Sequence, residues 1–299
     1  MNISNIHWHQ LDNIYSAIRR DLTRRPDWRF GPDRVYEVAK EGFDGIKSKI
    51  DIRDKSYCDL GCGTFHPFGV AAVMYINGAK ETTSLDLHPA NEPRAAEALA
   101  DLLKEIICFP KKWTWSSVTE AQLLDRARQF DLKALSEGNL LDGIGWLPLK
   151  HIVTDIHNPV IPKDSVDVMT SRAVLEHFLD FETASKRFLD IMKPGGFAYH
   201  HIDLVDHRAY ENNKYHFWSF LTEDQYWSDG ICNRLRPFQI REILEKSGFC
   251  ILDYDVITAE PPEGFINTIS DYYKNMPNSE LKATTVQCVI QKPIHLRIN

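Results

Sequence analysis

The order of hydrophobic and polar residues along the chain predicts short strands separated by helices. Five short runs bounded by turn residues have the length of strands, and they lie at 56–60, 82–87, 151–156, 166–171 and 197–204. Segments such as PFGVAAVMYINGA and FETASKRFLDIM have the composition of helices that pack between these strands. Because strands separated by helices pair in parallel with right-handed crossovers, we expect an α/β fold around a mostly parallel sheet.

Two more strands, CILDYDVI and TTVQCVIQK, follow a last helix, PFQIREILEKSGF. The alternation of polar and apolar residues in TTVQCVIQK is typical of an antiparallel strand at the edge of a sheet. The sequence therefore predicts a seven-stranded sheet whose last strand is antiparallel.

A helical extension, residues 1–55, precedes the main domain, residues 56–299. Apolar residues at three- and four-residue spacings from Leu11 to Leu22 predict a helix in the extension. Arginines also gather there beside Trp28, and they are Arg19, Arg20, Arg24, Arg25 and Arg29. Such a cluster either binds a phosphate or an anionic membrane surface, or simply keeps a surface helix solvated.

Two long connections interrupt the alternation of strands and helices. A helical insertion of about 90–150 separates the second and third strands, and it is longer than a crossover needs. Within it, ALADLLKEII and EAQLLDRARQFDLKAL predict amphipathic helices. The second connection, about 205–237, is rich in aromatic residues. Because ligands bind at the carboxyl edge of open α/β sheets, we expect both connections to wall a pocket there.

Charge and composition exclude several classes of protein. With 35 Lys and Arg against 42 Asp and Glu, the net charge of −7 argues against a general affinity for nucleic acids. The chain has no apolar run long enough to span a bilayer, and residues 1–10 do not resemble a signal peptide, so we expect a cytoplasmic protein. Its six cysteines form no CxxC pair, which favours reduced thiols over disulfides or structural zinc.

The turn after the first strand predicts a cofactor that contains a nucleoside. The segment from Asp59 to Thr64, DLGCGT, brings glycines to a strand-to-helix turn, where a ligand approaches the backbone closely. Asp86 ends the next strand, where a carboxylate accepts both hydroxyl protons of a ribose. A dinucleotide fingerprint would need its third glycine at His66, so binding of a pyrophosphate is disfavoured.

This turn resembles motif I of the class I S-adenosylmethionine-dependent methyltransferases. The resemblance continues in order with SLDLHP, VTDIHN, SRAVLEHF and KPGGFAYHH, and it runs through residues 57–292. It departs from many members at Phe65, which stands in place of a third glycine. The resemblance implies a Rossmann-like class I methyltransferase fold and S-adenosylmethionine as the cofactor.

The resemblance also implies which residues surround the cofactor. The first turn would hold the methionine portion of the cofactor through Asp59, Gly61, Cys62 and Gly63. At the end of the second strand, Asp86 would bind the ribose and Leu87 would lie against the adenine. Asp155 and Ile156 after the third strand would contact the adenine edge, and Ser171 and Arg172 at the end of the fourth strand would contact the methionine and methyl groups. For Asp155, the alternative is a helix N-cap.

The end of the fifth strand carries the candidate catalytic residues. A methyl group on a sulfonium is already activated, so the enzyme chiefly holds the acceptor in line, and a base helps when the acceptor is an alcohol. The period of a strand places His201 and Asp203 on one face and His200 on the other. We expect His201 to be the base, Asp203 to orient it or bind a sugar hydroxyl, and Asp206 and His207 to line the acceptor site. Each histidine has the alternative of a structural, hydrogen-bonded residue.

A metal site is a weaker alternative. Glu176 and His177 in VLEHF partly resemble the ExxEH element of metal-dependent methyltransferases, which act on small-RNA ends and ubiquinone precursors. Ala173 replaces the first acid of that element, which removes one ligand. The sequence therefore favours a site without metal, with Glu176 and His177 as alternative ligands.

The acceptor is indicated by a looser resemblance. HHIDLVDH, the aromatic connection and NRLRPFQIREILEKSGF resemble bacterial methyltransferases found with surface-polysaccharide biosynthesis. This implies an O-methyltransferase of a sugar, a glycan or a sugar-containing metabolite. The candidate acceptor ligands form two groups. The first would stack on a sugar ring, or else belong to the core, and consists of Trp218, Tyr226 and Trp227. The second would close over the acceptor or bind its phosphate, and consists of Asn233, Arg234 and Arg236.

Two other functions stay open. One is a methyltransferase of a phenolic or lipid-like molecule, and the other is a catalytically silent protein that binds the cofactor or a partner.

Overall fold

The computed structural model describes residues 32–294 except 159 and 224–230. The expected helix from Leu11 to Leu22, the arginine cluster, Tyr226 and Trp227 lie outside the described residues. No helix in the described ranges combines the length and the hydrophobicity needed to cross a bilayer.

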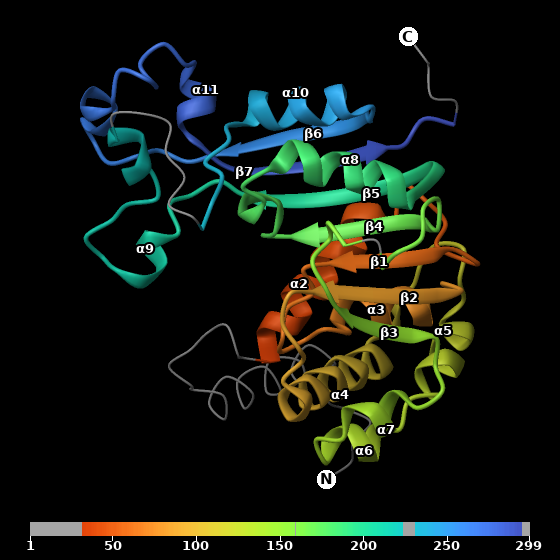
Figure 1. Cartoon of the computed structure of the whole chain (residues 1–299). Helices are drawn as coiled ribbons and strands as arrows, with labels where there is room; N and C mark the ends of the chain where they lie inside the picture. The colour runs from red at the N-terminus through yellow and green to blue at the C-terminus, as the bar shows by residue number, and fades with distance from the viewer. Residues whose placement is uncertain (1–31, 159, 224–230, 295–299) are drawn as a thin grey trace.

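A seven-stranded mixed sheet forms the centre of the molecule, in the order β3-β2-β1-β4-β5-β7-β6 (Figure 1). Its strands are β1 (Ser56–Leu60), β2 (Glu81–Asp86), β3 (Leu149–Val153), β4 (Val166–Arg172), β5 (Met192–Asp203), β6 (Cys250–Thr258) and β7 (Ala283–Gln291). The first five strands are parallel, and β7 is antiparallel to both neighbours. The expected α/β fold with an antiparallel last strand is confirmed.

The expected position of the last strand at the edge of the sheet is wrong. β7 lies between β5 and β6, and β6 forms the edge. The burial of the two strands explains this order, because β7 has buried residues along its whole length whereas β6 is largely exposed. The apolar side chains of Leu252 and Ile257 are each about half exposed on that edge strand.

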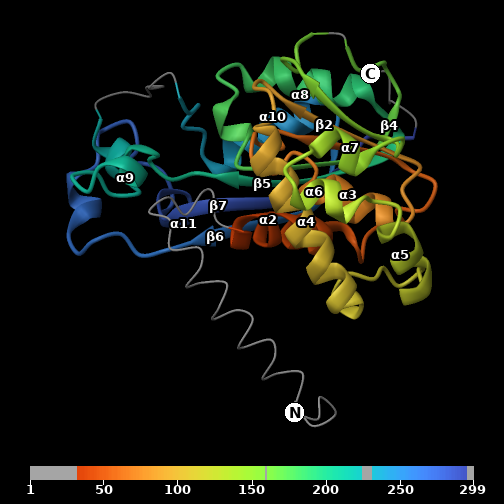
Figure 2. The same ribbon diagram turned by 90° about the horizontal axis from the view of Figure 1, so that it is seen from below.

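Helices cover both faces of the sheet (Figure 2). On one face lie α2 (Pro32–Ile46), α3 (Gly69–Ile76) and α4 (Glu92–Cys108), whose buried residues share one hydrophobic cluster. On the other face lie α8 (Phe181–Ile191) and α10 (Pro237–Ser247), which belong to a second cluster. The sheet therefore has two cores, one on each face.

Helix α2 packs tightly onto the first of these cores. Its residues Val35, Ala39, Phe43 and Ile46 are each 1% exposed or less, at spacings that form one face of a helix. The adjacent face of α2 carries Arg34, Val38 and Glu41, which line a cavity together with residues of β1 and β4.

The helical insertion begins with α4 and packs beside α3. After α4 it contains η3 (Pro110–Lys112), α5 (Glu120–Ala127), α6 (Leu132–Ser136) and α7 (Leu140–Ile144). The segment EAQLLDRARQFDLKAL is broken in two because the Asp131 carboxylate accepts the backbone N–H groups of Lys133 and Ala134 and so begins a new helix.

The second connection surrounds the carboxyl ends of β4 and β5. It contains α9 (Arg208–Glu211) and η5 (Ser219–Thr222), and η4 (Leu175–His177) follows β4. The segment between β6 and β7 adds η6 (Phe265–Thr268) and α11 (Asn278–Leu281) at the same end of the sheet (Figure 1). Together these segments build a small third core, which consists of Trp218, Phe220, Leu221, Ile269, Tyr273 and Leu281.

Candidate active site

The turn after β1 adopts a backbone conformation that only glycine adopts without strain. Gly61 has a φ of 67° and Gly63 a φ of 79°. A Cβ atom on Gly61 would lie 2.2 Å from Cγ2 of Val174, so the turn and the loop after β4 touch directly. The N–H of Gly63 donates to Oδ2 of Asp86 over 2.8 Å, which fixes the turn to the end of β2.

A cavity of about 550 Å³ opens beside this turn. Oδ1 of Asp86 accepts the backbone N–H of His88, and Oδ1 of Asp155 accepts that of His157, so both carboxylates are oriented by their own turns. Six of the expected cofactor residues line this cavity, namely Gly61, Gly63, Asp86, Leu87, Asp155 and Ile156. No residue of the insertion 90–150 lines it, so the expectation that the insertion walls this pocket is wrong.

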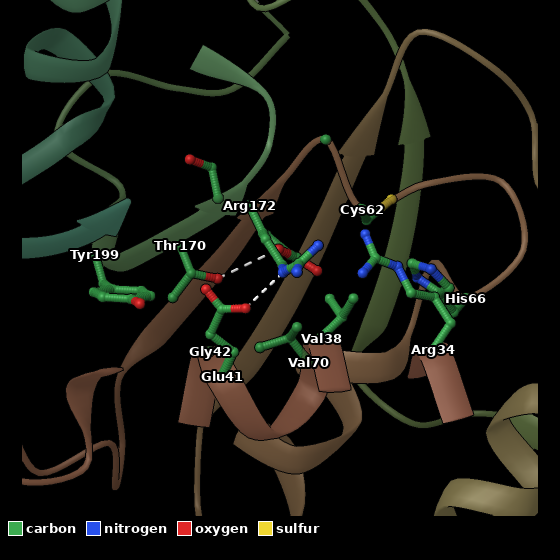
Figure 3. A pocket seen from close by; sticks show the side chains of 13 residues that line it. Arg34, Val38, Glu41, Gly42, Cys62, His66, Val70, Thr170, Arg172 and Tyr199 are labelled. Carbon is green, nitrogen blue, oxygen red and sulfur yellow. Dashed lines mark hydrogen bonds and ion pairs between the residues drawn. The ribbon is translucent and has the colours of Figure 1, made fainter. Parts of the chain in front are cut away.

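A second, narrower cavity of about 50 Å³ lies on the other side of Gly61, under α2. The remaining four expected cofactor residues, Asp59, Cys62, Ser171 and Arg172, line it. Arg34 and Glu41 reach it from α2 (Figure 3). Because Gly61 lines both cavities, the ten expected residues line two adjoining cavities at the ends of β1, β2, β3 and β4.

Asp59 is a buried acid without a positively charged partner among the described residues. Its side chain accepts a hydrogen bond from Oγ1 of Thr170 over 3.3 Å. Burial, together with the negative charge of Asp86, raises the pKa of Asp59 to about 7. A cationic group that entered this cavity would stabilise the ionised carboxylate.

Two guanidinium groups face the same narrow cavity (Figure 3). Burial lowers the pKa of Arg34, and repulsion from Arg172 adds to that effect. Nε of Arg172 donates to Oε2 of Glu41 over 2.5 Å. The cavity therefore presents positive and negative groups side by side, as a zwitterionic ligand requires.

Sequence reasoning missed Arg34 and Glu41. The helical pattern of α2 shows only that these polar residues lie outside its apolar, core-facing stripe. It contains no signal that they lie over β1 and β4, because that placement depends on contacts far apart in the chain.

The histidines of β5 differ in their environments. His200 is fully buried, its Nδ1 shares a 2.7 Å hydrogen bond with Oγ of Ser171, and burial lowers its pKa to about 3. It is therefore a neutral structural residue. His201, on the opposite face, is hydrogen-bonded through Nδ1 to Oε1 of Glu41. A carboxylate on Nδ1 orients the ring and leaves Nε2 as the basic atom, so the geometry agrees with the expected role of His201.

Beyond His201, four side chains converge at the ends of β4 and β5. We call Glu176, His177, Asp203 and His207 the polar cluster. Oε1 of Glu176 lies 3.9 Å from Nε2 of His177 and 4.0 Å from Nε2 of His207, and Oδ2 of Asp203 lies 3.5 Å from Nε2 of His207. Burial raises the pKa of Glu176 well above its ordinary range.

Asp206 and Arg234 are structural residues, contrary to expectation. The Asp206 carboxylate is fully buried and receives Arg208 over 2.6 Å and Arg234 over 3.3 Å. The Arg234 guanidinium, 5% exposed, lies over the ring of Phe220. This ion-pair network fixes the start of the connection after β5 and leaves no carboxylate oxygen exposed to an acceptor.

Three more of the expected acceptor ligands have structural contacts instead, namely Asn233, Arg236 and Trp218. The Asn233 side chain donates to the carbonyls of Leu175 and Phe178, which holds the η4 turn. Arg236 is 1% exposed and donates to backbone carbonyls that include those of Leu204 and Glu280. Trp218 is 7% exposed in the third core. Because these side chains are buried or bonded within the protein, the expectation that they contact an acceptor is corrected.

Other aromatic residues lie exposed beside the polar cluster. Tyr210 is 50% exposed and Phe217 41% exposed, with ring centroids 5.8 Å apart. The ring of His207 lies 5.5 Å from that of Tyr210. An aromatic surface thus adjoins the cluster, formed by different residues from those expected.

The sequence family described as a methyltransferase domain matches residues 34–254. The chain belongs to this family. It is an S-adenosylmethionine-dependent methyltransferase. The matched range begins in α2 and ends in β6, so it contains both cavities and the polar cluster.

Solved structures resemble this methyltransferase at low sequence identity. An S-adenosylmethionine-dependent methyltransferase from Mesorhizobium loti is 14% identical, with 85% of this chain and 99% of that chain covered and a TM-score of 0.44. Geranyl diphosphate C-methyltransferase from Streptomyces coelicolor A3(2) is 11% identical, with 91% and 87% covered and a TM-score of 0.49. No curated protein matches the chain significantly.

The residues of the methyltransferase fit S-adenosylmethionine. Its ribose diol suits the Asp86 carboxylate, which lines the large cavity beside the glycine turn. Its methionine portion carries an ammonium and a carboxylate, which suit Asp59 and the two guanidinium groups of the narrow cavity. When bound, the cofactor supplies a methyl group on a positively charged sulfur.

Proposed function

We propose that this methyltransferase methylates a hydroxyl group of a sugar, a glycan or a sugar-containing metabolite. The observation that carries the proposal is the polar cluster, in which carboxylates and imidazoles converge next to the cofactor site. His177 lines the large cavity and also belongs to the cluster, so the two are continuous. Carboxylates and imidazoles recognise hydroxyl groups, and exposed aromatic rings stack on the apolar face of a sugar.

The chain's own residues divide the work of the transfer. His201, oriented by Glu41, takes the proton of the acceptor hydroxyl. Asp203 and His207 bind acceptor hydroxyls, and Tyr210 positions Asp203 by donating its hydroxyl to Oδ2 over 2.7 Å. Holding the acceptor in line in this way is worth up to about 7–11 kcal/mol of the barrier in favourable cases.

The polar cluster also distinguishes the alternatives. A phenolic or lipid-like acceptor would favour a closed apolar pocket without convergent carboxylates, and here the exposed aromatic residues adjoin Asp203 and His207. A catalytically silent protein would have no need of an oriented base. The sugar hydroxyl is therefore the acceptor that the described residues support best.

The proposal is tested by calorimetry with S-adenosylhomocysteine together with a methyl-release assay over sugars, sugar nucleotides and phenols. We expect methyl transfer to at least one polyhydroxylated acceptor and none to simple phenols. His201→Ala should retain cofactor affinity and lose turnover by about 100-fold or more. Undiminished turnover in this variant would refute the role of His201, and transfer to phenols alone would refute the choice of acceptor.

A further inference from the structure

Glu176 occupies an unusual position for a carboxylate. Its side chain is 3% exposed, and neither oxygen has a hydrogen-bond partner within the described ranges. Burying an unpaired carboxylate is costly, and proteins normally pair such a group or use it to bind a metal. The backbone of the same residue is held firmly, because its carbonyl accepts the N–H of Asn233 over 2.7 Å.

His177 and His207 lie beside Glu176 at distances that are too long for hydrogen bonds. The separations are 3.9 Å to His177, 4.0 Å to His207, and 3.5 Å between His207 and Asp203. Two ligand atoms that each lie about 2.0–2.2 Å from one cation are roughly 3–4 Å apart. The atoms of Glu176, Asp203 and His207 all lie within 4.8 Å of one another, so small shifts of the side chains bring them to a shared cation.

Outer contacts fix the orientation of His177, His207 and Asp203. Nδ1 of His177 bonds the carbonyl of Ile231 over 2.8 Å, so Nδ1 carries the proton and Nε2 presents a lone pair. Nδ1 of His207 contacts Sγ of Cys232 over 3.3 Å, which leaves its Nε2 facing the two carboxylates. Oδ1 of Asp203 accepts the N–H of Val205. Metal-binding histidines and carboxylates are commonly held by such partners.

We propose that Glu176, Asp203 and His207 bind one divalent transition-metal cation. An imidazole nitrogen beside two carboxylates suits Mn²⁺, Fe²⁺, Co²⁺ or Zn²⁺, whereas Mg²⁺ and Ca²⁺ prefer oxygen ligands alone. The cation removes the cost of the buried Glu176 charge. Resting on the proposed function, the cation takes over the contacts with sugar hydroxyls that were assigned above to Asp203 and His207. Its remaining coordination positions bind the oxygen atoms of neighbouring hydroxyls and promote transfer of the proton to His201.

The test is a titration of chelator-treated protein with Mn²⁺ and Co²⁺, followed by calorimetry and by the visible absorption of Co²⁺. We expect one equivalent of either metal to bind. His207→Gln and Glu176→Gln should each weaken binding at least tenfold, and Tyr210→Phe should weaken it less. The matched control His216→Gln changes an exposed histidine outside the cluster and should bind like the parent protein.

Cysteine ligation gives a separate readout. The atoms of His177, His207 and Cys232 also lie within 4.8 Å of one another. In our assignment the thiol stays outside the coordination sphere, so the Co²⁺ complex should show no sulfur-to-metal charge-transfer band. A strong band that is lost in Cys232→Ser would overturn the assigned ligand set.

Binding of S-adenosylhomocysteine to each variant reports whether the protein is folded. If the parent protein binds this ligand but neither metal, or if the cluster variants bind metal like His216→Gln, the metal site is refuted. If metal binds as expected while no sugar is methylated, the proposed function fails and the site stands. If sugars are methylated by metal-free protein at full rate, the function stands and the role of the cation fails.

Discussion

Cofactor binding should release a proton from Asp59. The pKa of this buried acid is raised to about 7, so at pH 6 about nine in ten Asp59 side chains are protonated before binding. The ammonium of the cofactor favours the ionised carboxylate. We therefore expect about 0.9 proton to be released per S-adenosylhomocysteine bound at pH 6, and about 0.1 at pH 8.

The same pKa makes the stability of the cofactor-free protein depend on pH. The folded-state pKa of about 7 lies above the unfolded value of about 3.9, so the folded protein binds more protons between these limits. Stability falls as the pH rises from about 4 to 7, and the shift of about 3 units corresponds to roughly 4 kcal/mol. Asp59→Asn removes this contribution because an amide does not titrate.

Calorimetry at pH 6 in buffers of different ionisation enthalpy measures the released proton directly. The observed binding enthalpy should vary with the buffer for the parent protein and not for Asp59→Asn. The control Asp155→Asn weakens binding but keeps Asp59, so its proton release should persist. An enthalpy that is independent of the buffer in the parent protein, or equal release from Asp59→Asn, would refute the reasoning.

Three further changes test other parts of the site. Gly61→Ala should lower the unfolding free energy by about 2–4 kcal/mol, measured with denaturant, because the φ of Gly61 is positive and the added Cβ would meet Val174. Adding Val174→Ala should recover only the part of this loss that comes from the steric contact. Arg236→Gln should lower stability by about 3 kcal/mol without changing S-adenosylhomocysteine affinity, since buried carbonyls lose their donor. Glu41→Gln should lower kcat and alter its pH profile, because the ring of His201 loses its carboxylate; an unchanged profile would contradict this role.

The sequence predicted the sheet and the larger cavity well, for a physical reason. Asp86 ends β2 and Asp155 lies just beyond β3, and the carboxyl ends of such parallel strands meet at one edge. The order of β6 and β7 could not be predicted from the sequence. Polar and apolar residues alternate in both strands, and only contacts with neighbouring elements decide which strand lies inside the sheet.

The acceptor side was predicted less accurately. Arg236 and Trp218 belong to residue types that also bind ligands, and spacing along the chain does not reveal that segments after β6 bury them. The polar cluster depends on contacts between residues about 30 apart in sequence, as with Glu176 and His207. Such contacts follow from the tertiary fold and leave no periodic signal.

Glu41 joins two regions of the enzyme that sequence motifs treat separately. One of its oxygens holds Arg172 at the cofactor cavity and the other holds His201 on the acceptor side. A small displacement of α2 therefore changes donor binding and proton acceptance together. Substitutions at Ala39, a fully buried residue of α2 that lines neither cavity, should alter KM and kcat in the same variant.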